Sequence, residues 1–192
     1  MPILGIVASA ISGNLVTTSY ESIATVTVGS GGTSTITFSS IPSTYTHLQV
    51  RLIARGGRTD ADTAAGGLYI QLNSNYLTSM HQLRGNGSAA SAAGYSGGLN
   101  NGYIIIWVPA SNASANIFGA GVVDILDYAN TNKTKVIRTL SGDDINGGGY
   151  ITFNSGLWNS TSAITSITFG STDGIGNIPE YSSFALYGIK GS

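Results

Sequence analysis

The amino-acid sequence predicts an all-β protein, a jelly-roll-like antiparallel β-sandwich that carries an extended N-terminal arm. Three observations predict this fold class. Apolar and polar residues alternate with a period of two in many segments, whereas the 3.6-residue period of amphipathic helices is almost absent. These segments are short and are separated by turns, and 27 of the 192 residues are glycine. Hydrophobic residues make up 42% of the chain, which is enough for a buried core.

The first half of the domain contains four predicted strands. Residues Tyr20–Val28 and Thr35–Phe38 flank the sequence GSGGT at 29–33, and this arrangement predicts a hairpin-like pair. Residues His47–Ala54 alternate clearly, with Leu, Val and Leu sharing one face. Residues Leu68–Leu72 alternate again, after a loop rich in Gly, Asp, Thr and Ala.

The second half is less regular. The stretch Arg84–Asn101 is rich in Gly, Ser, Ala and Asn, and its composition predicts a loop. The apolar run Tyr103–Val108 predicts a buried central strand that Pro109 ends. Two glycines within the apolar segment Ile117–Tyr128 predict a β-bulge. The remaining predicted strands are Lys133–Leu140, in which the alternation is imperfect, Tyr150–Phe153, Ile164–Phe169 and Ser183–Ile189.

The N-terminal segment Met1–Val16 carries no side-chain charge. No basic residue precedes its apolar stretch, which argues against a signal peptide, and the stretch is shorter than the roughly 20 apolar residues of a membrane-spanning helix. We therefore expect residues 1–18 to be an extended arm that docks on another protein, and residues 19–192 to form the β-sandwich domain. The expected assembly residues of the arm are Met1, Pro2, Ile3, Leu4, Ile6 and Val7.

The charge content of the chain is very low. Charged residues make up 9% of the sequence, against roughly 25% in an average soluble protein. Such a chain either packs much of its surface into an assembly or covers it with neutral polar groups. The net charge is −1 and no basic run exists, so nucleic acid is not expected as a partner. The absence of cysteine excludes disulfides and thiolate metal sites.

One segment matches a catalytic motif by its letters alone. Residues Gly94–Gly98 contain the G-x-S-x-G pattern of serine hydrolases, with Ser96 at its centre. That motif requires a strand-to-helix elbow, and no helical pattern follows it here. Both histidines, His47 and His81, precede the serine, whereas the hydrolase order places the histidine after it. We assign no catalytic residue and expect a chain that is not an enzyme.

Two acidic pairs are candidates for cation or acid–base sites. Asp124 and Asp127 are separated by an odd offset that places them on opposite faces of a regular strand, so pairing with Lys133 or Arg138 near turns is favoured. The sequence DDING at 143–147 resembles half of a calcium loop but lacks the distal glutamate, and it is typical of a tight turn. Two distant histidines do not favour a zinc site. No metal site and no cofactor is expected.

The aromatic residues allow two interpretations. The chain has ten tyrosines and two tryptophans, and Tyr, Ser, Gly and Asn together are typical of adaptable recognition surfaces. Tyr76, Tyr95 and Trp158 lie in or beside predicted loops, where they could form such a surface or fill the core. Trp107, in an apolar run, is expected in the core.

Seven segments of the chain form a recognisable set. They are Met1–Ala8 (MPILGIVA), Ser19–Val28 (SYESIATVTV), Ile36–Arg51 (ITFSSIPSTYTHLQVR), Asp124–Gly142 (DILDYANTNKTKVIRTLSG), Ser155–Trp158 (SGLW), Ala163–Thr168 (AITSIT) and Ser183–Gly191 (SFALYGIKG). Together these segments resemble small virion proteins of tailed bacteriophages. The resemblance covers most of the chain and leaves the region 55–101 as its variable part, and none of its segments carries a catalytic motif.

This resemblance implies a structural role in a virion that is assembled in the host cytoplasm. It favours a capsid decoration or cement protein that clamps neighbouring capsid subunits, often as a trimer. The implied partners are the major capsid protein or another virion protein and further copies of the chain in a homotrimer, with no nucleic acid and no membrane. A tail-fibre or receptor-binding module that attaches to the host surface is the alternative, with the loops at 58–66 and 84–101 meeting a receptor. A free carbohydrate-binding lectin is a third possibility.

Overall fold

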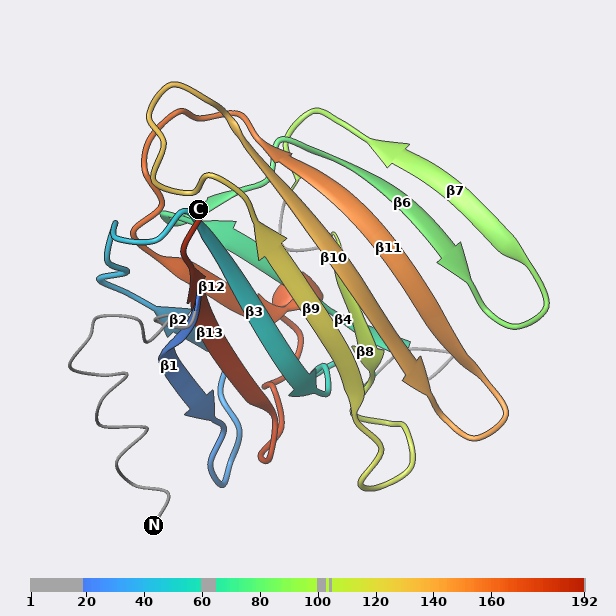
Figure 1. The fold of residues 1–192 in the computed structure, drawn as a ribbon. Coiled ribbons are helices and arrows are strands. Elements are labelled where there is room, and N and C mark those ends of the chain that lie inside the picture. The colour runs from blue at the N-terminus through green and yellow to red at the C-terminus, as the bar shows by residue number, and fades with distance from the viewer. Residues whose placement is uncertain (1–18, 60–64, 100–102, 104, 192) are drawn as a thin grey trace, which may run out of the picture.

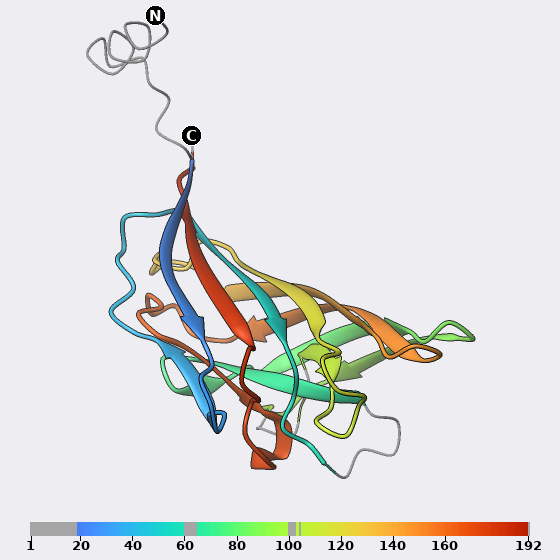
Figure 2. The ribbon, with the colours of Figure 1, turned by 90° about the horizontal axis from the view of Figure 1, so that it is seen from below.

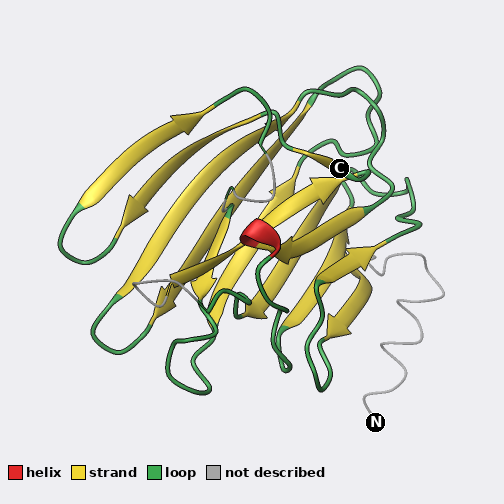
Figure 3. Cartoon of the chain, turned by 180° about the vertical axis from the view of Figure 1, so that it is seen from behind, coloured by secondary structure: helices red, strands yellow, loops and turns green. Residues whose placement is uncertain are grey.

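The computed structural model describes residues 19–59, 65–99, 103 and 105–191. Its strands form two antiparallel sheets that lie face to face, and the only helical element among these residues is a short 3₁₀ turn, Thr172–Gly174 (Figures 1 and 3). Seen from below, the larger sheet forms one layer and the smaller sheet lies against one of its faces (Figure 2). The prediction of an all-β antiparallel sandwich is confirmed.

The larger sheet contains eight strands. In spatial order they are β1 (Tyr20–Thr27), β13 (Ser183–Ile189), β3 (His47–Ala54), β9 (Gly119–Ile125), β10 (Lys135–Asp144), β11 (Gly149–Trp158), β6 (Ser79–Gly85) and β7 (Ala90–Tyr95). The smaller sheet runs in the order β2 (Thr35–Phe38), β12 (Ile167–Ser171), β4 (Ala65–Leu72) and β5 (Asn75–Tyr76), and β8 (Ile106–Pro109) also pairs with β4. This strand order, with eight strands in one sheet, does not confirm the jelly-roll part of the prediction.

The core lies between the two sheets. On β3, Leu48, Val50 and Leu52 face inward and are buried, as the alternation predicts. Phe184 of the larger sheet and Phe169 of the smaller sheet meet across the layers, with their ring centroids 5.3 Å apart. The inward residues of β3, β9 and β13 therefore form a conventional apolar core beneath one half of the larger sheet.

Two predictions of how strands pair are wrong, because the strands concerned pair with strands that lie far away in the sequence. The segments predicted as a hairpin, β1 and β2, belong to different sheets: β1 pairs with β13 and β2 pairs with β12. The apolar run that ends at Pro109 forms β8, whose only partner among the described strands is β4, so it is not a central strand, although Ile106 and Val108 are buried. A continuous apolar run predicts that a strand is buried, but it does not predict whether the strand has one neighbouring strand or two.

The predicted loop at 84–101 is also wrong over about half of its described part. Strands β6 and β7 form a hairpin here, at one edge of the larger sheet (Figure 1). The side chain of Asn86 closes its turn by accepting a hydrogen bond from the backbone N–H of Ala89 at 2.9 Å. A segment of Ala and Ser shows no alternation of apolar and polar residues. Its backbone N–H and C=O groups can nevertheless form the hydrogen bonds of a sheet.

The β-bulge predicted in β9 does not occur. Strand β9 keeps a continuous register with both of its neighbours, and the irregularity in the sheet lies in β1, between Ser22 and Ala24. Gly121 of β9 serves packing instead, because a Cβ at this position would lie 3.3 Å from side-chain atoms of Leu52 and Ile106. The glycine thus lets the two sheets approach closely at this point.

Candidate docking surface

Three neighbouring strands of the larger sheet, β10, β11 and β6, turn polar side chains toward the core. Such an arrangement is the reverse of the usual strand of a sandwich, whose inner face is apolar. Each of these side chains is at most 8% exposed. They are Lys135, Thr139 and Ser141 of β10, Thr152 and Asn154 of β11, and Gln82 of β6.

These inward side chains hydrogen-bond one another and the backbone. The Asn154 amide donates to the carbonyl of Ile105 at 2.8 Å and to Oγ1 of Thr139 at 2.9 Å. Its oxygen accepts a hydrogen bond of 2.9 Å from the side-chain amide of Gln82, and Thr139 donates to the carbonyl of Ile105 at 2.7 Å. A buried polar network is tolerated when its members are paired, so this cluster fixes which face of the three strands is the inner one.

A second pairing ties the same strands to the smaller sheet. Ser141 of β10 and Thr152 of β11 share a hydrogen bond of 2.8 Å. Ser141 also accepts a bond of 2.9 Å from the backbone N–H of Trp107, which belongs to β8. A slip of one residue in the register of β10 would break both contacts.

Because the register of these strands is fixed, apolar side chains on the opposite face of the sheet point outward. Six of them form a surface that we call the apolar band: Ile53, Leu83, Val122, Leu140, Ile151 and Phe153. Between 48% and 63% of five of these residues is exposed, and only Val122 is half-buried. Val122, Leu140, Phe153 and Leu83 are successive cross-strand neighbours, so the apolar surface is contiguous over four strands.

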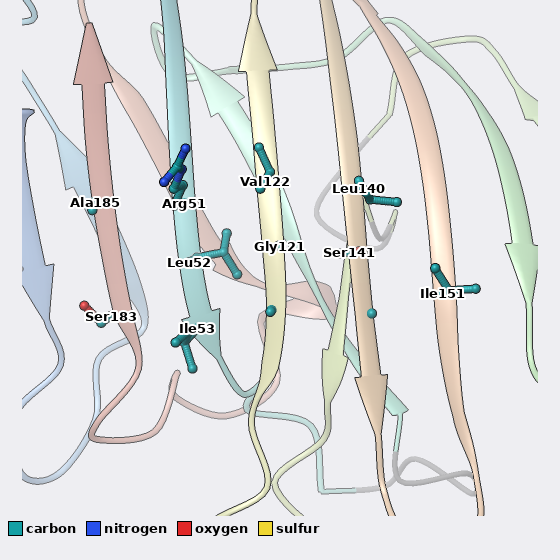
Figure 4. A pocket seen from close by; sticks show the side chains of 12 residues that line it. Arg51, Leu52, Ile53, Gly121, Val122, Leu140, Ser141, Ile151, Ser183 and Ala185 are labelled. Carbon is teal, nitrogen blue, oxygen red and sulfur yellow. The ribbon is translucent and has the colours of Figure 1, made fainter. Parts of the chain in front are cut away.

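The apolar band contains a shallow hollow, shown close up in Figure 4. Ile53 and Ile151 stand three strands apart, or about 14 Å. The cross-strand positions between them are held by the small residues Ala120 and Gly142, which form the floor. The hollow measures about 620 Å³, and Arg51 on its rim is its one charged lining residue.

Charged and polar groups lie on the same face beside the apolar band, where they contact one another. The Arg51 guanidinium lies 5.2 Å from the ring centre of Tyr20 and 5.6 Å from that of Tyr187, and its Nε donates to Gln49 at 3.0 Å. Gln49 in turn donates to Asp124 at 2.7 Å, and Asp124 stands opposite Arg138 on the next strand. These groups leave the apolar band itself uncharged.

The acidic residues considered as a catalytic pair are separated by the end of β9. Asp124 lies within the strand, whereas Asp127 lies beyond it with a φ of 51°. Lys133 contacts Asp127 at 2.7 Å, as predicted, and holds the pKa of that carboxyl below its usual range. The backbone N–H of Asp127 donates to Nδ1 of His47 at 3.0 Å, so this histidine takes part in a turn.

The sequence DDING ends β10 with its two aspartates and continues into the tight turn that leads to β11, as predicted. Asn146 and Gly147 both have positive φ, and Asp144 accepts a hydrogen bond of 2.8 Å from the N–H of Asn146. Asp143 accepts a bond of 3.1 Å from the N–H of Tyr150, while its other oxygen is buried without a partner. Burial raises the pKa of this carboxyl. Within the described residues, no group of three or more His, Cys, Asp or Glu could hold a metal ion.

The candidate serine and histidine lie near β7. Ser96 directly follows that strand and precedes Gly97 and Gly98, both of which have positive φ, so the chain turns here without entering a helix. His81 stands opposite Gly94 on the neighbouring strand, and a Cβ on that glycine would lie 3.1 Å from its ring. The strand-to-helix elbow of a serine hydrolase is thus not formed at this position.

The loop aromatics pack against other side chains. Tyr76 meets Tyr69 edge-on at 5.3 Å, and Tyr95 meets Tyr103 in the same way at 5.3 Å. Trp158 ends β11 and is buried in the core. The core-filling interpretation therefore holds for Trp158, and the tyrosines are half-buried pairs.

The apolar band was not among the sites that sequence reasoning found. The predicted assembly residues of the arm, Met1, Pro2, Ile3, Leu4, Ile6 and Val7, lie outside the described residues. The one available signal was the imperfect alternation of Lys133–Leu140, in which apolar residues occupy both faces of the strand.

No helix in the described ranges is long and apolar enough to cross a membrane. Comparison of the chain with protein-family models, with curated proteins and with solved structures gives no match. Function must therefore be argued from the surface itself.

Proposed function

We propose that the chain is a non-enzymatic structural protein of a bacteriophage virion. Its most direct role is that of a capsid decoration or cement protein that clamps neighbouring capsid subunits. The observation that carries this proposal is the apolar band, in which Leu140, Ile151 and Phe153 expose about half or more of their surface although polar residues fill the core beneath them. A contiguous apolar surface on a folded domain marks an interaction site.

The chemistry of the apolar band favours a protein partner. Five of its six side chains are aliphatic, and Phe153 is its only aromatic residue, whereas sugar-binding surfaces rely on aromatic rings bordered by polar groups. The hollow has a single cationic residue on its rim, Arg51, whose guanidinium already lies over two tyrosine rings, so it offers little to a phosphate backbone. An apolar protein segment, from a second copy of the chain or from another virion protein such as the major capsid protein, fits these features.

The low charge of the chain supports the same proposal. With only 9% charged residues, the domain lacks the repulsive surface that keeps soluble monomers apart. The resemblance to small phage virion proteins supplies the particular assembly, and the apolar band supplies the place of contact. We infer that copies of the chain are incorporated into the particle through this face.

The copy number in purified particles tests the proposed role. A decoration protein occupies many equivalent sites, so we expect hundreds of copies per virion in a quantitative protein gel. A count of a few dozen or fewer would reject decoration and favour the tail-fibre or receptor-binding alternative. A chain missing from particles altogether would reject the virion role.

A second experiment tests the contact face. Particles assembled with the Phe153→Asp variant are expected to lack the protein, because the substitution places a charge in the apolar band. The matched control is Tyr181→Asp, which changes an aromatic residue that is 69% exposed and lies outside the apolar band. Equal incorporation of the two variants would show that this face is not the attachment surface.

A further inference from the structure

We propose that the apolar band of one copy receives the N-terminal segment Met1–Thr18 of a neighbouring copy, so that exchanged arms join the copies. The inference deepens the proposed function and rests on it only in placing the apolar band in an interface. It names the occupant of that surface as a second copy's own chain. Three features support it: the composition of the segment, the place where it joins the domain, and the direction in which β1 runs.

The composition of the segment matches the surface. The first charged residue of the chain is Glu21, so the whole segment is free of charged side chains. Its branched aliphatic residues are Ile3, Leu4, Ile6, Val7, Ile11, Leu15 and Val16, and most of the residues between them are small. The six side chains of the apolar band are likewise uncharged, and Arg51 is the one charged residue that lines its hollow. Bringing the two together therefore buries aliphatic surface with a single charge at its rim.

The segment joins the domain on the face that carries the apolar band. Tyr20, the first residue of β1, hydrogen-bonds Gln49 through its hydroxyl, and its ring lies 4.9 Å from that of Tyr187. Arg51, on the rim of the hollow, lies over both rings. Tyr20 therefore lies on the outer face of the larger sheet, at the edge strand of that sheet.

The direction of β1 indicates that the arm binds the apolar band of a neighbouring copy and not the apolar band of its own copy. Strand β1 runs from Tyr20 toward Thr27, which pairs with Ser183, and Ser183 pairs with Ile53 of the apolar band. The described chain therefore begins at the end of the sheet away from Ile53, where Ser19 continues the ladder by accepting a 2.9 Å bond from the N–H of Lys190.

Docking on the same copy would require the chain to reverse and to cross the polar row of Gln49, Asp124 and Arg138. Docking on a neighbour requires neither. Eighteen extended residues reach at most about 60 Å, which exceeds the roughly 34 Å width of an eight-stranded sheet. Such a contact joins two different surfaces, so it generates a closed ring when the rotation closes, and a trimer is the small ring that we expect.

The test uses two full-length variants that damage opposite halves of the contact. Ile3→Asp/Ile6→Asp changes the arm and leaves the apolar band intact, whereas Leu140→Asp changes the apolar band and leaves the arm intact. Association is measured by sedimentation velocity for each protein alone and for an equal mixture. Tyr181→Asp is the matched control outside the apolar band, and circular dichroism with urea unfolding verifies that each variant is folded.

We expect the wild type to associate with increasing concentration and each variant alone to associate at least about 100-fold more weakly. The mixture is expected to form a one-to-one complex, because one intact arm then meets one intact apolar band. A wild type that stays monomeric, a variant that associates like Tyr181→Asp, or a mixture without complexes would each overturn the inference. If Leu140→Asp fails to fold, Ile151→Asp takes its place in the same mixture.

The outcome is separable from that of the proposed function. If the variants associate normally but Phe153→Asp is still lost from particles, the exchanged arm is wrong and the virion role stands. If the mixture forms complexes but the wild type is missing from particles, the exchanged arm stands and the virion role is wrong.

Discussion

Replacing Asn154 with leucine is expected to destabilise the fold strongly, although the two side chains are similar in size. Asn154 is fully buried and makes three hydrogen bonds, to the carbonyl of Ile105, to Thr139 and to Gln82. Leucine removes all three. The carbonyl of Ile105 keeps its bond from Thr139, but the amide of Gln82 loses its acceptor in a buried position.

The magnitude follows from these contacts. Three hydrogen bonds contribute about 1 kcal/mol each, and a buried amide without an acceptor costs about 1 to 3 kcal/mol. The added apolar surface of leucine offsets roughly 1 to 2 kcal/mol of this loss. We therefore expect Asn154→Leu to lower the free energy of unfolding by about 2 to 5 kcal/mol, a large part of the total stability of a domain.

A double-mutant cycle in urea separates pairing from mere size. Gln82→Leu alone is expected to destabilise the protein as well, because it leaves the Asn154 oxygen unpaired. The double variant Gln82→Leu/Asn154→Leu replaces both partners with apolar groups, so its loss should fall short of the sum of the single losses by at least about 1 kcal/mol. Ser155→Ala, which changes the neighbouring outward residue, should stay within about 0.5 kcal/mol of the wild type.

The reasoning is refuted if Asn154→Leu behaves like Ser155→Ala, or if the two leucine substitutions add without coupling. Either result would mean that the polar pairs do not decide which face of β10 and β11 is buried. The exposure of the apolar residues on the other face would then need another cause.

Three further predictions concern single features of the fold. Leu140→Thr/Ile151→Thr should change the free energy of unfolding by no more than about 1 kcal/mol in urea and should reduce binding of a hydrophobic dye, because both side chains point outward; a loss of several kcal/mol would place them in the core. Lys135→Met should cost about 2 to 4 kcal/mol in the same assay, because three backbone carbonyls lose the buried ammonium that donates to them, and an unchanged midpoint would contradict this. Burial raises the pKa of Asp143 above its ordinary value near 3.8, so the folded state favours the neutral acid, and Asp143→Asn should be stabilising at neutral pH. That gain should shrink as the pH falls through the raised pKa toward 3.8, and urea midpoints that differ equally at pH 7 and pH 4 would contradict it.

The strands that the sequence predicted well have one apolar and one polar face. In β3, the leucines and valine at 48, 50 and 52 face the core and the residues between them face out, so alternation alone locates the strand and its inner side. Strand β13 follows the same rule, with Phe184 and Leu186 buried. Where burial decides the register, the pattern is readable.

The elements that the sequence missed depend on contacts between distant residues or on the backbone alone. Strand β7 consists largely of Ala, Ser and Gly, which give no alternation, yet it completes a hairpin with β6. The true partner of β1 is β13, more than 150 residues later in the chain. Local patterns cannot specify such pairings, because every exposed strand edge offers the same backbone groups.

The candidate site was missed for a related reason. In β10, both Ile137 and Leu140 are apolar, and only the hydrogen bonds of Thr139 and Ser141 decide that Ile137 faces the core and Leu140 faces out. A polar inner face breaks the usual pattern of a sandwich strand. Natural proteins break such patterns chiefly where function requires it, so the misreading itself points to the apolar band.

The most direct test of the central claim is side-chain labelling of the apolar band before and after assembly. Hydroxyl-radical oxidation of Leu140 and Phe153, read by mass spectrometry, is compared between purified particles and the recombinant Ile3→Asp/Ile6→Asp variant. A covered apolar band predicts several-fold less oxidation of both residues in the particle, with Tyr181 labelled similarly in the two samples. Equal oxidation of Leu140 and Phe153 in the particle and in the free variant would contradict the claim that this surface is a docking site.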